Sequence, residues 1–359
     1  MTNTFPEFEG IMCPLPLPHS ERIVMGHGSG GKMSYDLISK IFLPIFGNPI
    51  LKTGDDAGLI KIPNDDGDIF TKLAISTDSH VVMPLFFPGG DIGRLAICGT
   101  VNDISMLGAT PLYMTAGFVL EEGLDVDTLK KVVESMHEAA VEANIQIVAG
   151  DTKVVQNGKA DGMYINTTGV GVVPMGITIS GTNAQPGDVV IISGTIGDHG
   201  IAVLAARGEL KFETQIKSDV SPLNGLVTSM LETTKEIHVL RDPTRGGLAT
   251  SLNEIALQSQ VGIMIYEDKI PIRPAVEAAC EMLGYDALYV ANEGKLIAIV
   301  EKNNADRLLN AMKKHPLGAD AEIIGTVAER PDRHVILKTT FGTTRVVDMM
   351  SGEMLPRIC

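Results

Sequence analysis

The sequence predicts an α/β protein with two domains. Its 359 residues allow roughly two domains at about 150 residues each. Short apolar segments typical of β-strands alternate with segments whose apolar residues recur at helical spacing, which is the pattern of α/β folds. Hydrophobic residues make up 44% of the chain and charged residues 20%, so the composition suits a globular protein with a full core.

The first domain is expected over residues 21–178, after a proline-rich extension at 1–20 that shows no periodicity. Its clearest element is an amphipathic helix over 127–143, with Asp125 or Asp127 as a candidate N-cap. Further helices are expected at 33–42 and 91–107, a short apolar strand at 73–77 and a buried strand at 145–149.

The second domain is expected over residues 179–346 and begins with the apolar segment DVVIISG at Asp188. Residues 347–359 contain Gly352 and Pro356 without periodicity, which predicts a flexible tail. Helices are expected at about 199–206, 221–236, 247–259, 272–283 and 304–314, and strands near 262–266, 287–300, 321–327 and 334–347.

Charge and composition exclude several functional classes. The formal net charge is −15, whereas nucleic-acid binding draws on Lys and Arg that neutralise phosphates. No segment approaches the length of an apolar membrane span, and residues 1–19 do not have the pattern of a secretory signal. The four cysteines form no CxxC pair, so we expect neither a disulfide framework nor a zinc knuckle, and a cytoplasmic location.

A glycine-rich segment, GHGSGGK at 26–32, precedes the first predicted helix. Lys32 is followed by Met33, so the segment is not a Walker A motif. Backbone N–H groups around Gly30 and Gly31, together with the Lys32 charge, are still suited to bind an anion. A tight turn before a helix is the alternative interpretation.

Acidic residues occur at the edges of several predicted elements of the first domain. They are Asp55 and Asp56 in GDDAG, Asp78 in STDSH, Asn102 and Asp103 in GTVNDIS, and Asp151 with Thr152 in GDTK. Hard oxygen ligands from several loops are what Mg²⁺ needs when it bridges nucleotide phosphates. Each group taken alone is more typical of turns and helix caps, and it is the occurrence of four such groups in one domain that favours a metal site.

The second half contains two further polar motifs. Arg241 and Arg245 flank a Gly-Gly helix start in RDPTRGG, where they are suited to clamp a phosphate or a carboxylate. Glu293 lies between two apolar segments and is interpreted either as a general base or as a turn residue. The eight histidines form no HxH or HExxH pair, and His199, beside a glycine, is expected to be a loop residue.

Cys359 is the last residue of the sequence, in the segment PRIC. A cysteine thiolate is a good nucleophile, and Arg357 would favour it while the terminal carboxylate opposes it. Because the cysteine is last, the segment is not a CaaX prenylation signal. A reactive thiol on a proline-containing arm would move between two sites, and an incidental tail residue is the alternative.

Taken together, GHGSGGK, GDDAG, STDSH, GTVNDISMLGA, GDTKV, RDPTRGGLA, NEGKL and the ending PRIC resemble the HypE family of hydrogenase maturation proteins. The resemblance runs from about residue 22 to 359. The PRIC ending is its specific part, since the acidic motifs are shared with other PurM-like enzymes that use ATP. It implies a PurM-like fold with two α/β domains and a homodimer built from the amino-terminal sheets.

The resemblance also implies an activity and partners. A HypF carbamoyltransferase would place a carbamoyl group on Cys359. The chain would then use ATP and Mg²⁺ to dehydrate this S-carboxamide to an S-cyanate, and the cyanide would pass to iron on a HypC–HypD complex.

On this basis each residue receives an expected role. Cys359 would carry the group, and Lys153 and Glu293 would handle charge and protons near it. Nucleotide and phosphates would be held by Gly30, Gly31, Lys32, Asp55, Asp56, Asp78, Asn102, Asp103, Asp151 and Thr152, and the metal by Asp55, Asp56, Asp78, Asp103 and Asp151. The alternatives are a selenophosphate synthetase, a small-molecule kinase of the same superfamily, and a non-catalytic scaffold with a docking tail.

Overall fold

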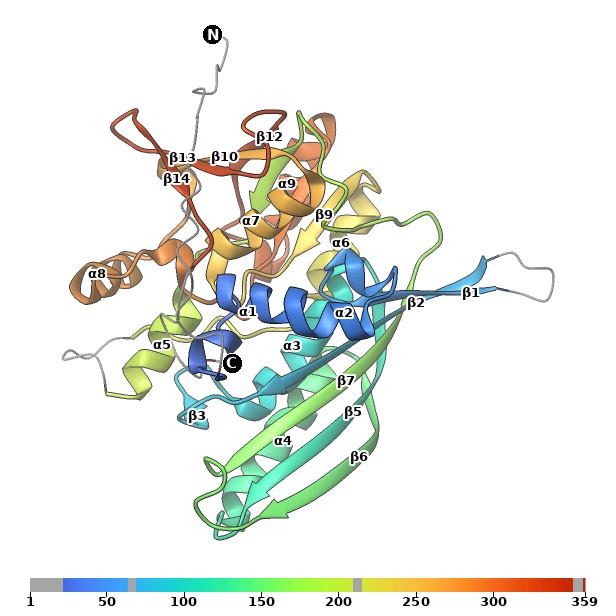
Figure 1. Ribbon diagram of the computed structural model, residues 1–359, viewed down its shortest axis with the longest axis vertical. Coiled ribbons are helices and arrows are strands. Elements are labelled where there is room, and N and C mark those ends of the chain that lie inside the picture. Colours follow the sequence, from blue (N-terminus) through green and yellow to red (C-terminus); the bar gives the residue numbers. More distant parts are fainter. Residues whose placement is uncertain (1–21, 64–68, 209–214, 351–357, 359) are drawn as a thin grey trace.

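The computed structural model describes residues 22–63, 69–208, 215–350 and 358. The predicted extension at 1–20, most of the predicted tail and Cys359 itself therefore lie outside the described residues. Two sheets, one in each half of the chain, form the framework (Figure 1). None of the described helices is both long and apolar enough to cross a membrane.

The first sheet has five strands in the order β1-β2-β7-β5-β6. The strands are β1 (Gly58–Pro63), β2 (Ile69–His80), β5 (Thr110–Glu121), β6 (Gln146–Val155) and β7 (Met163–Val173). All neighbours are antiparallel except β5 and β6, which are joined by a helical crossover. Parallel neighbours require such a crossover. Two short strands, β3 (Phe86–Phe87) and β4 (Gly90–Asp91), form a separate pair.

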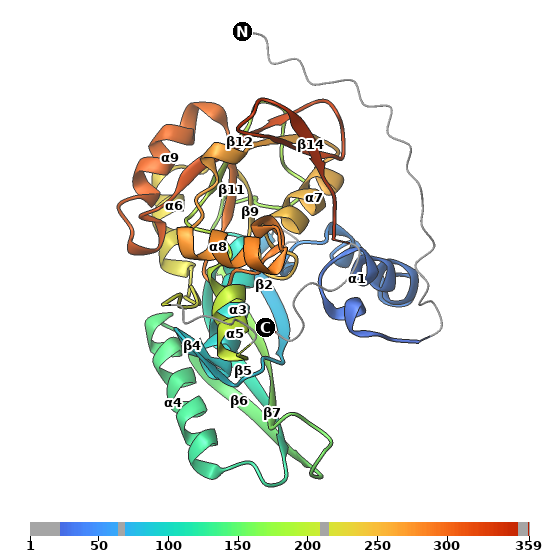
Figure 2. The same ribbon diagram turned by 90° about the vertical axis from the view of Figure 1, so that its left-hand side faces the viewer.

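Two helices cover one face of this sheet, and their N-caps explain where they begin. The Asp91 side chain accepts hydrogen bonds from the first turn of α3 (Ile92–Met106), and Asp125 does the same for α4 (Val126–Glu142). Acidic side chains at these positions satisfy backbone N–H groups that lack partners within the helix. Figure 2 shows α4 on one side of the sheet and α1 on the other.

The second sheet has seven strands in the order β14-β13-β10-β12-β8-β11-β9. The strands are β8 (Val189–Ile192), β9 (Ile237–Arg241), β10 (Gly262–Tyr266), β11 (Ile297–Val300), β12 (Glu322–Ala328), β13 (Val335–Lys338) and β14 (Thr344–Val347). The helices are α5 (Asp198–Ala206), α6 (Asn224–Thr233), α7 (Gly247–Ser259), α8 (Pro274–Leu283) and α9 (Ala305–Met312).

Strand β8 is buried on both faces, which explains its unbroken apolar run. Val190 and Ile192 pack in one hydrophobic cluster with α5, α7 and α8, whereas Val189 and Ile191 pack in another with α6 and α9. Alternate residues of a strand point to opposite faces, so one strand supplies both cores.

Helix α3 joins the two halves. Its first turns pack in the cluster that contains Val190 and Ile192 of β8, whereas Ile104 and Met106 pack in the cluster that contains Leu226 of α6. Asn102 and Asp103 therefore lie at the junction between the domains, which is where the candidate site forms.

Several expected elements differ from the observed ones. The helix predicted at 33–42 is present as α1 (Lys32–Leu37), a π-helical turn (Ile38–Phe42) and α2 (Leu43–Phe46). Its apolar residues Ile38, Ile41 and Phe42 are exposed and not packed in a core. Of the segment at 145–149, Ile145 is buried as expected, but residues 146–149 belong to β6, which forms a sheet edge and is exposed.

In the second domain, the strand expected over 287–300 is divided. A short 3₁₀ turn (Ala287–Tyr289) and a loop precede β11, so Glu293 lies in that loop. At the other end of the domain, Val347 is buried in β14, and the domain therefore extends past residue 346.

Candidate active site

Five carboxyl groups from both domains lie close enough at the junction for their charges to interact. Three come from the turn before β1, from β2 and from α3, and two come from the loops that follow β9 and precede β11. These residues, called the acidic cluster below, are Asp56, Asp78, Asp103, Asp242 and Glu293. The Ser76 hydroxyl lies 2.5 Å from Asp103 Oδ2 and 3.2 Å from the Asp56 carbonyl oxygen, so β2 links two of the segments.

Burial and mutual repulsion raise the pKa of three members of the acidic cluster, Asp103, Asp242 and Glu293. Burial raises the pKa of Asp103 well above its usual value, and the charges of Asp242 and Asp78 raise it further. The pKa of Glu293 is raised well above its usual value by burial and then by Asp242 and Asp78. Burial and the charge of Asp56 likewise raise the pKa of Asp242. Because these groups repel one another when ionised, a bound cation would stabilise the cluster.

The donor set fits a hard divalent cation such as Mg²⁺, which prefers carboxylate oxygens. Within the described residues, no group of three or more His, Cys, Asp or Glu side chains is arranged to hold a metal ion by itself. The acidic cluster would therefore supply only part of a coordination shell. Waters and phosphate oxygens complete the shell of Mg²⁺ in many nucleotide sites.

Replacing Asp103 with Asn is expected to stabilise the ligand-free protein. The amide keeps an acceptor for the Ser76 hydroxyl and removes one charge from the acidic cluster. In the wild-type protein, the raised pKa of Asp103 destabilises the folded state. This destabilisation is absent below the pKa of about 4 that Asp has in the unfolded chain, and it grows as the pH rises toward the raised pKa of the folded state. We expect the free energy of unfolding to increase by about 1 kcal/mol or more at neutral pH, since one pKa unit corresponds to about 1.4 kcal/mol.

Thermal unfolding without Mg²⁺, followed over a pH series, measures this effect of the Asp103→Asn substitution. Asp127→Asn is the matched control because its carboxyl is 75% exposed on α4, and we expect no comparable gain from it. A lower midpoint for Asp103→Asn at neutral pH would show that the cluster is not repulsive.

Arg241 provides the main positive charge beside the acidic cluster. Its guanidinium is paired with Asp56 and also donates to the Gly54 carbonyl oxygen and to Gln258 Oε1, each at 3.1 Å. The side chain is almost fully buried. Arg241 was expected to clamp a phosphate or a carboxylate. It clamps the carboxylate of Asp56 in its own chain and is not free to bind a phosphate. Arg245 remains at the surface, with its guanidinium donating to the Gly28 carbonyl oxygen at 3.2 Å.

The Glu293 loop is held by contacts to its backbone. Asn102 Nδ2 donates to the Glu293 carbonyl oxygen at 3.2 Å and to that of Ser221 at 3.1 Å, and Asn102 Oδ1 accepts from Leu223 N at 2.8 Å. Asn102 was expected to bind nucleotide. Because its buried amide is engaged on both sides, it is better described as a clamp that positions the Glu293 loop.

Asp219 also positions this loop. Its Oδ1 accepts from the Glu293 backbone N–H at 3.1 Å. Although burial favours the neutral acid, the Lys295 ammonium group, 3.2 Å from Oδ2, keeps the pKa of Asp219 below its usual value. The Glu293 carboxyl itself is buried, and its Oε1 has no hydrogen-bond partner among the residues that the structure describes. An unpaired buried carboxylate oxygen is costly, which is typical of groups kept for chemistry.

The glycine segment at 26–32 packs against the end of the second domain. A Cβ at Gly31 would lie 2.3 Å from the Met350 carbonyl oxygen, and Lys32 N donates to that same oxygen at 2.7 Å. Gly30 N donates to Ser34 Oγ at 2.9 Å. Two of the backbone N–H groups expected to bind an anion are therefore engaged within the chain. The Lys32 side chain is exposed.

Four predicted site residues do not belong to the acidic cluster. Asp55 binds Ser180 Oγ and the Gly181 backbone N–H, so it attaches the first domain to the connecting segment. Asp151 and Lys153 pair with each other on β6 and are 69% and 68% exposed. Thr152, between them on the same strand, is also exposed.

The strand register explains the position of Asp151. It pairs with Gly117 on β5, which pairs with Asn166 on β7, which in turn pairs with Ser79 on β2. Asp151 is therefore three strands, about 14 Å, from Ser79. Directly paired residues share a face of a sheet, so Asp151 lies on the face opposite to Asp78. A single chain does not bring Asp151 and Lys153 to the acidic cluster.

The two cysteines in the described part of the chain are structural. Cys98 on α3 and Cys280 on α8 are buried. Burial raises the pKa of Cys98 to about 12 and that of Cys280 to about 11. Thiols of this kind are poor nucleophiles at neutral pH. Cys359, the predicted carrier, lies outside the described residues, although its neighbour Ile358 is described and buried.

Asp242 was not among the predicted ligands. It directly follows β9, a strand that was not predicted; the helix predicted at 221–236 ends directly before this strand, whereas α6 ends at Thr233. The available signal was a short apolar run that ends in Arg-Asp-Pro, a pattern consistent with a buried strand. Ser76 and Asp219 carried no comparable signal, because their importance comes from contacts with distant segments.

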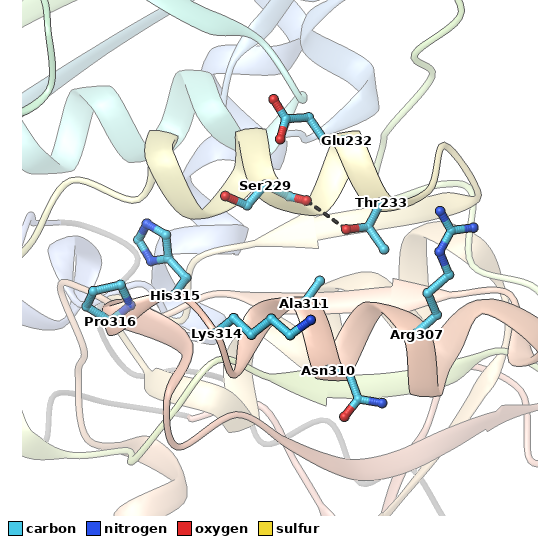
Figure 3. A pocket seen from close by; sticks show the side chains of 9 residues that line it. All are labelled: Ser229, Glu232, Thr233, Arg307, Asn310, Ala311, Lys314, His315 and Pro316. Carbon is cyan, nitrogen blue, oxygen red and sulfur yellow. Dashed lines mark hydrogen bonds between the residues drawn. The ribbon is translucent and has the colours of Figure 1, made fainter.

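A separate groove of about 850 Å³ lies between α6 and α9 (Figure 3). Glu232, Arg307 and Lys314 are among its lining residues, and the Thr233 hydroxyl donates to the Ser229 carbonyl oxygen at 2.9 Å. No member of the acidic cluster lines this groove. The chemistry-bearing residues are thus at the domain junction and not in this groove.

Comparisons with known proteins agree with this architecture. Residues 54–173 match the N-terminal domain model of AIR synthase related proteins, and residues 185–338 match the C-terminal domain model. A protein named carbamoyl dehydratase HypE from Cupriavidus necator is 54% identical over 350 residues, which are 98% of each chain.

Two solved structures are also similar. A structure titled HypE-HypF complex is 52% identical, with a TM-score of 0.82 over 88% of this chain and 99% of that chain. A structure titled hydrogenase maturation protein HypE in complex with ATP is 48% identical, with a TM-score of 0.78 over 93% and 98%. These matches confirm the predicted PurM-like fold, and the chain belongs to the HypE family of carbamoyl dehydratases.

Proposed function

We propose that this chain uses ATP to dehydrate a carbamoyl group on Cys359 to an S-cyanate, which supplies cyanide for a nickel–iron hydrogenase centre. The observation that carries the proposal is that the end of the chain and Glu293 are held by adjacent residues. Ser218 contacts His199, whose ring binds the Ile358 carbonyl oxygen, and Asp219 accepts from the Glu293 backbone. Cys359 follows Ile358 directly in the sequence.

The chemistry requires a good leaving group. Transfer of the γ-phosphoryl group of ATP to the carboxamide oxygen turns that oxygen into part of a phosphate. Phosphate then departs as the C≡N bond forms and the N–H protons are removed. One S-carboxamide and one ATP thus give one S-cyanate, one ADP and one phosphate. The Glu293 carboxylate is our candidate for the base that accepts a proton from nitrogen.

The acidic cluster would hold the metal that this transfer needs. When bound, Mg²⁺ would neutralise charge on the phosphates, which is the main requirement of phosphoryl transfer. Asp78 and Asp103 are the best candidates among the predicted ligands, because Asp56 is paired with Arg241 and Asp55 is bonded to Ser180 and Gly181. Lys32 and the glycine segment would approach the nucleotide after releasing their present backbone contacts.

We further propose a homodimer that pairs through the first sheet. Three apolar residues of the edge strand β6, Ile147, Val148 and Val154, are 43%, 58% and 68% exposed. Long apolar edge strands are normally covered. Asp151 and Lys153 lie on this strand and away from the acidic cluster of their own chain, so their proposed roles at the nucleotide require a second copy.

Val148→Asp is expected to convert the dimer to a monomer and to suppress dehydration, because it places a charge in the proposed interface. Sedimentation velocity measures the mass, and circular dichroism checks the fold. Val126→Asp is the matched control, since Val126 is 65% exposed at the start of α4. A wild-type chain that sediments as a monomer would contradict the proposed pairing.

HypF is the proposed source of the carbamoyl group, supported by the relative solved as a HypE-HypF complex. A HypC–HypD complex is the proposed acceptor of cyanide. The carrier must be a free thiol, which agrees with a location in the reducing cytoplasm.

ATP hydrolysis measured before and after carbamoylation of the tail by HypF distinguishes the candidate functions. We expect turnover that depends on the carbamoyl group. Turnover that is independent of the tail would favour a small-molecule kinase. No turnover in either state would favour a scaffold.

A further inference from the structure

The His199 side chain makes specific contacts that catalysis by Glu293 does not explain. It lies at the start of α5 and is completely buried. Its Nε2 is 2.5 Å from the Ile358 carbonyl oxygen, and its Nδ1 is 2.8 Å from Ser218 Oγ. Phe87 packs against the ring edge-on, with 5.4 Å between the ring centroids. Each side of the imidazole therefore has a defined neighbour.

These neighbours determine the state of the ring. A carbonyl oxygen only accepts hydrogen bonds, so Nε2 must carry a proton. In the neutral imidazole Nδ1 then accepts from the Ser218 hydroxyl, whose oxygen in turn accepts from the Val220 backbone N–H at 3.1 Å. Burial lowers the pKa of His199 and so favours this neutral form. Ser218 thus selects the tautomer that can bind the end of the chain.

Ile358 contributes a second, apolar contact. Its side chain is 6% exposed and belongs to the hydrophobic cluster that contains Ile201 and Val220. A main-chain hydrogen bond together with one buried aliphatic side chain is a reversible mode of attachment, because it involves no charge pair. It is suited to a segment that must leave to meet another protein.

We propose that His199, oriented by Ser218, is a latch that holds the Ile358 carbonyl group and thereby keeps the end of the chain in place during dehydration. This inference rests on the proposed function and assigns its positioning residue. His199 acts through the peptide and does not touch the reacting atoms, so it is distinct from the proposed base. The latch must open when Cys359 receives its carbamoyl group from another protein and when it delivers cyanide.

Alkylation of Cys359 by iodoacetamide, resolved by peptide mass spectrometry, tests the latch without requiring activity. His199→Leu removes the hydrogen-bond donor, and the apolar leucine side chain still occupies the buried space. We expect alkylation of Cys359 to become roughly tenfold faster, because one hydrogen bond is lost. His199→Gln retains an N–H donor and is expected to stay near the wild-type rate. Cys98 is an internal control, since its completely buried thiol reacts only if the protein unfolds.

A second readout connects the latch to the reaction. In single-turnover experiments on carbamoylated full-length chain, His199→Leu is expected to slow water loss roughly tenfold without changing the affinity for ATP. Ser218→Ala is expected to have a smaller effect in the same direction. His238→Leu, which removes a half-buried histidine that contacts Asp188, is the matched control and should change neither rate.

The outcomes separate the latch from the proposed function. Unchanged alkylation in His199→Leu would overturn the latch, and faster alkylation with unchanged dehydration would overturn its role in positioning. If wild-type chain carries a carbamoyl group but never loses water, the proposed function fails, while the alkylation rates still decide whether His199 holds the tail.

Discussion

Replacing Cys359 with Ala is expected to abolish S-cyanate formation completely while leaving ATP affinity unchanged. Alanine has no sulfur to which a carbamoyl group can be attached. The acidic cluster and the glycine segment do not depend on this side chain, and the latch binds the carbonyl group of the preceding residue. Intact mass after reaction with HypF measures the first effect, and calorimetric titration with ATP measures the second.

Cys280→Ala is the matched control for Cys359→Ala. The Cys280 thiol is buried on α8, and its pKa of about 11 keeps it protonated at neutral pH. We therefore expect this variant to be carbamoylated and dehydrated normally. A carbamoyl or cyanate adduct on a cysteine other than Cys359 in the wild-type chain would contradict the assignment of the carrier.

Glu293→Gln is expected to slow dehydration by about 10²- to 10⁴-fold, the usual contribution of a general base. The amide has nearly the same shape and keeps the backbone contacts of the loop, but it cannot accept a proton. Carbamoylation of Cys359 should remain normal, so the carbamoylated protein should accumulate. Rapid-quench mass spectrometry of the carbamoylated chain measures the rate.

The pH dependence provides an independent test of Glu293. Burial and the neighbouring Asp242 raise its pKa above the usual value for Glu. A base is active only when it is deprotonated, so the wild-type rate should increase with pH through this raised pKa, and Glu293→Gln should lose this increase.

Glu254→Gln is the control for Glu293→Gln, since the carboxyl of Glu254 lies 3.9 Å from Arg241 and is not proposed to accept a proton. It should keep the increase of rate with pH. Wild-type activity in Glu293→Gln would exclude this residue as the base.

The sequence predicted best those elements whose signals are local. Helices α3 and α4 were predicted because their apolar residues recur at helical spacing, and α4 also because an acidic N-cap candidate precedes it. The edge strand β6 was interpreted incorrectly, because Ile147 and Val148 resemble core residues. A sequence alone does not show whether an apolar strand is covered by its own chain or by another.

The candidate site shows the same limit. Asp56, Asp78 and Asp103 were predicted and do come together. Asn102 was grouped with them because it precedes Asp103, yet helical geometry turns its side chain toward another loop. His199 was interpreted as a loop residue, whereas it is buried on α5. Its partner, Ile358, is 159 positions away in the sequence, so no local pattern could reveal the contact.

The most direct test of the central claim is the intact mass of the chain during incubation with HypF, carbamoyl phosphate and ATP. The account predicts a gain of one carbamoyl group at Cys359, followed by the loss of one water only when ATP is present. A carbamoylated chain that never loses water, or a gain at another residue, would contradict the claim that this protein is an ATP-dependent dehydratase acting on its own terminal cysteine.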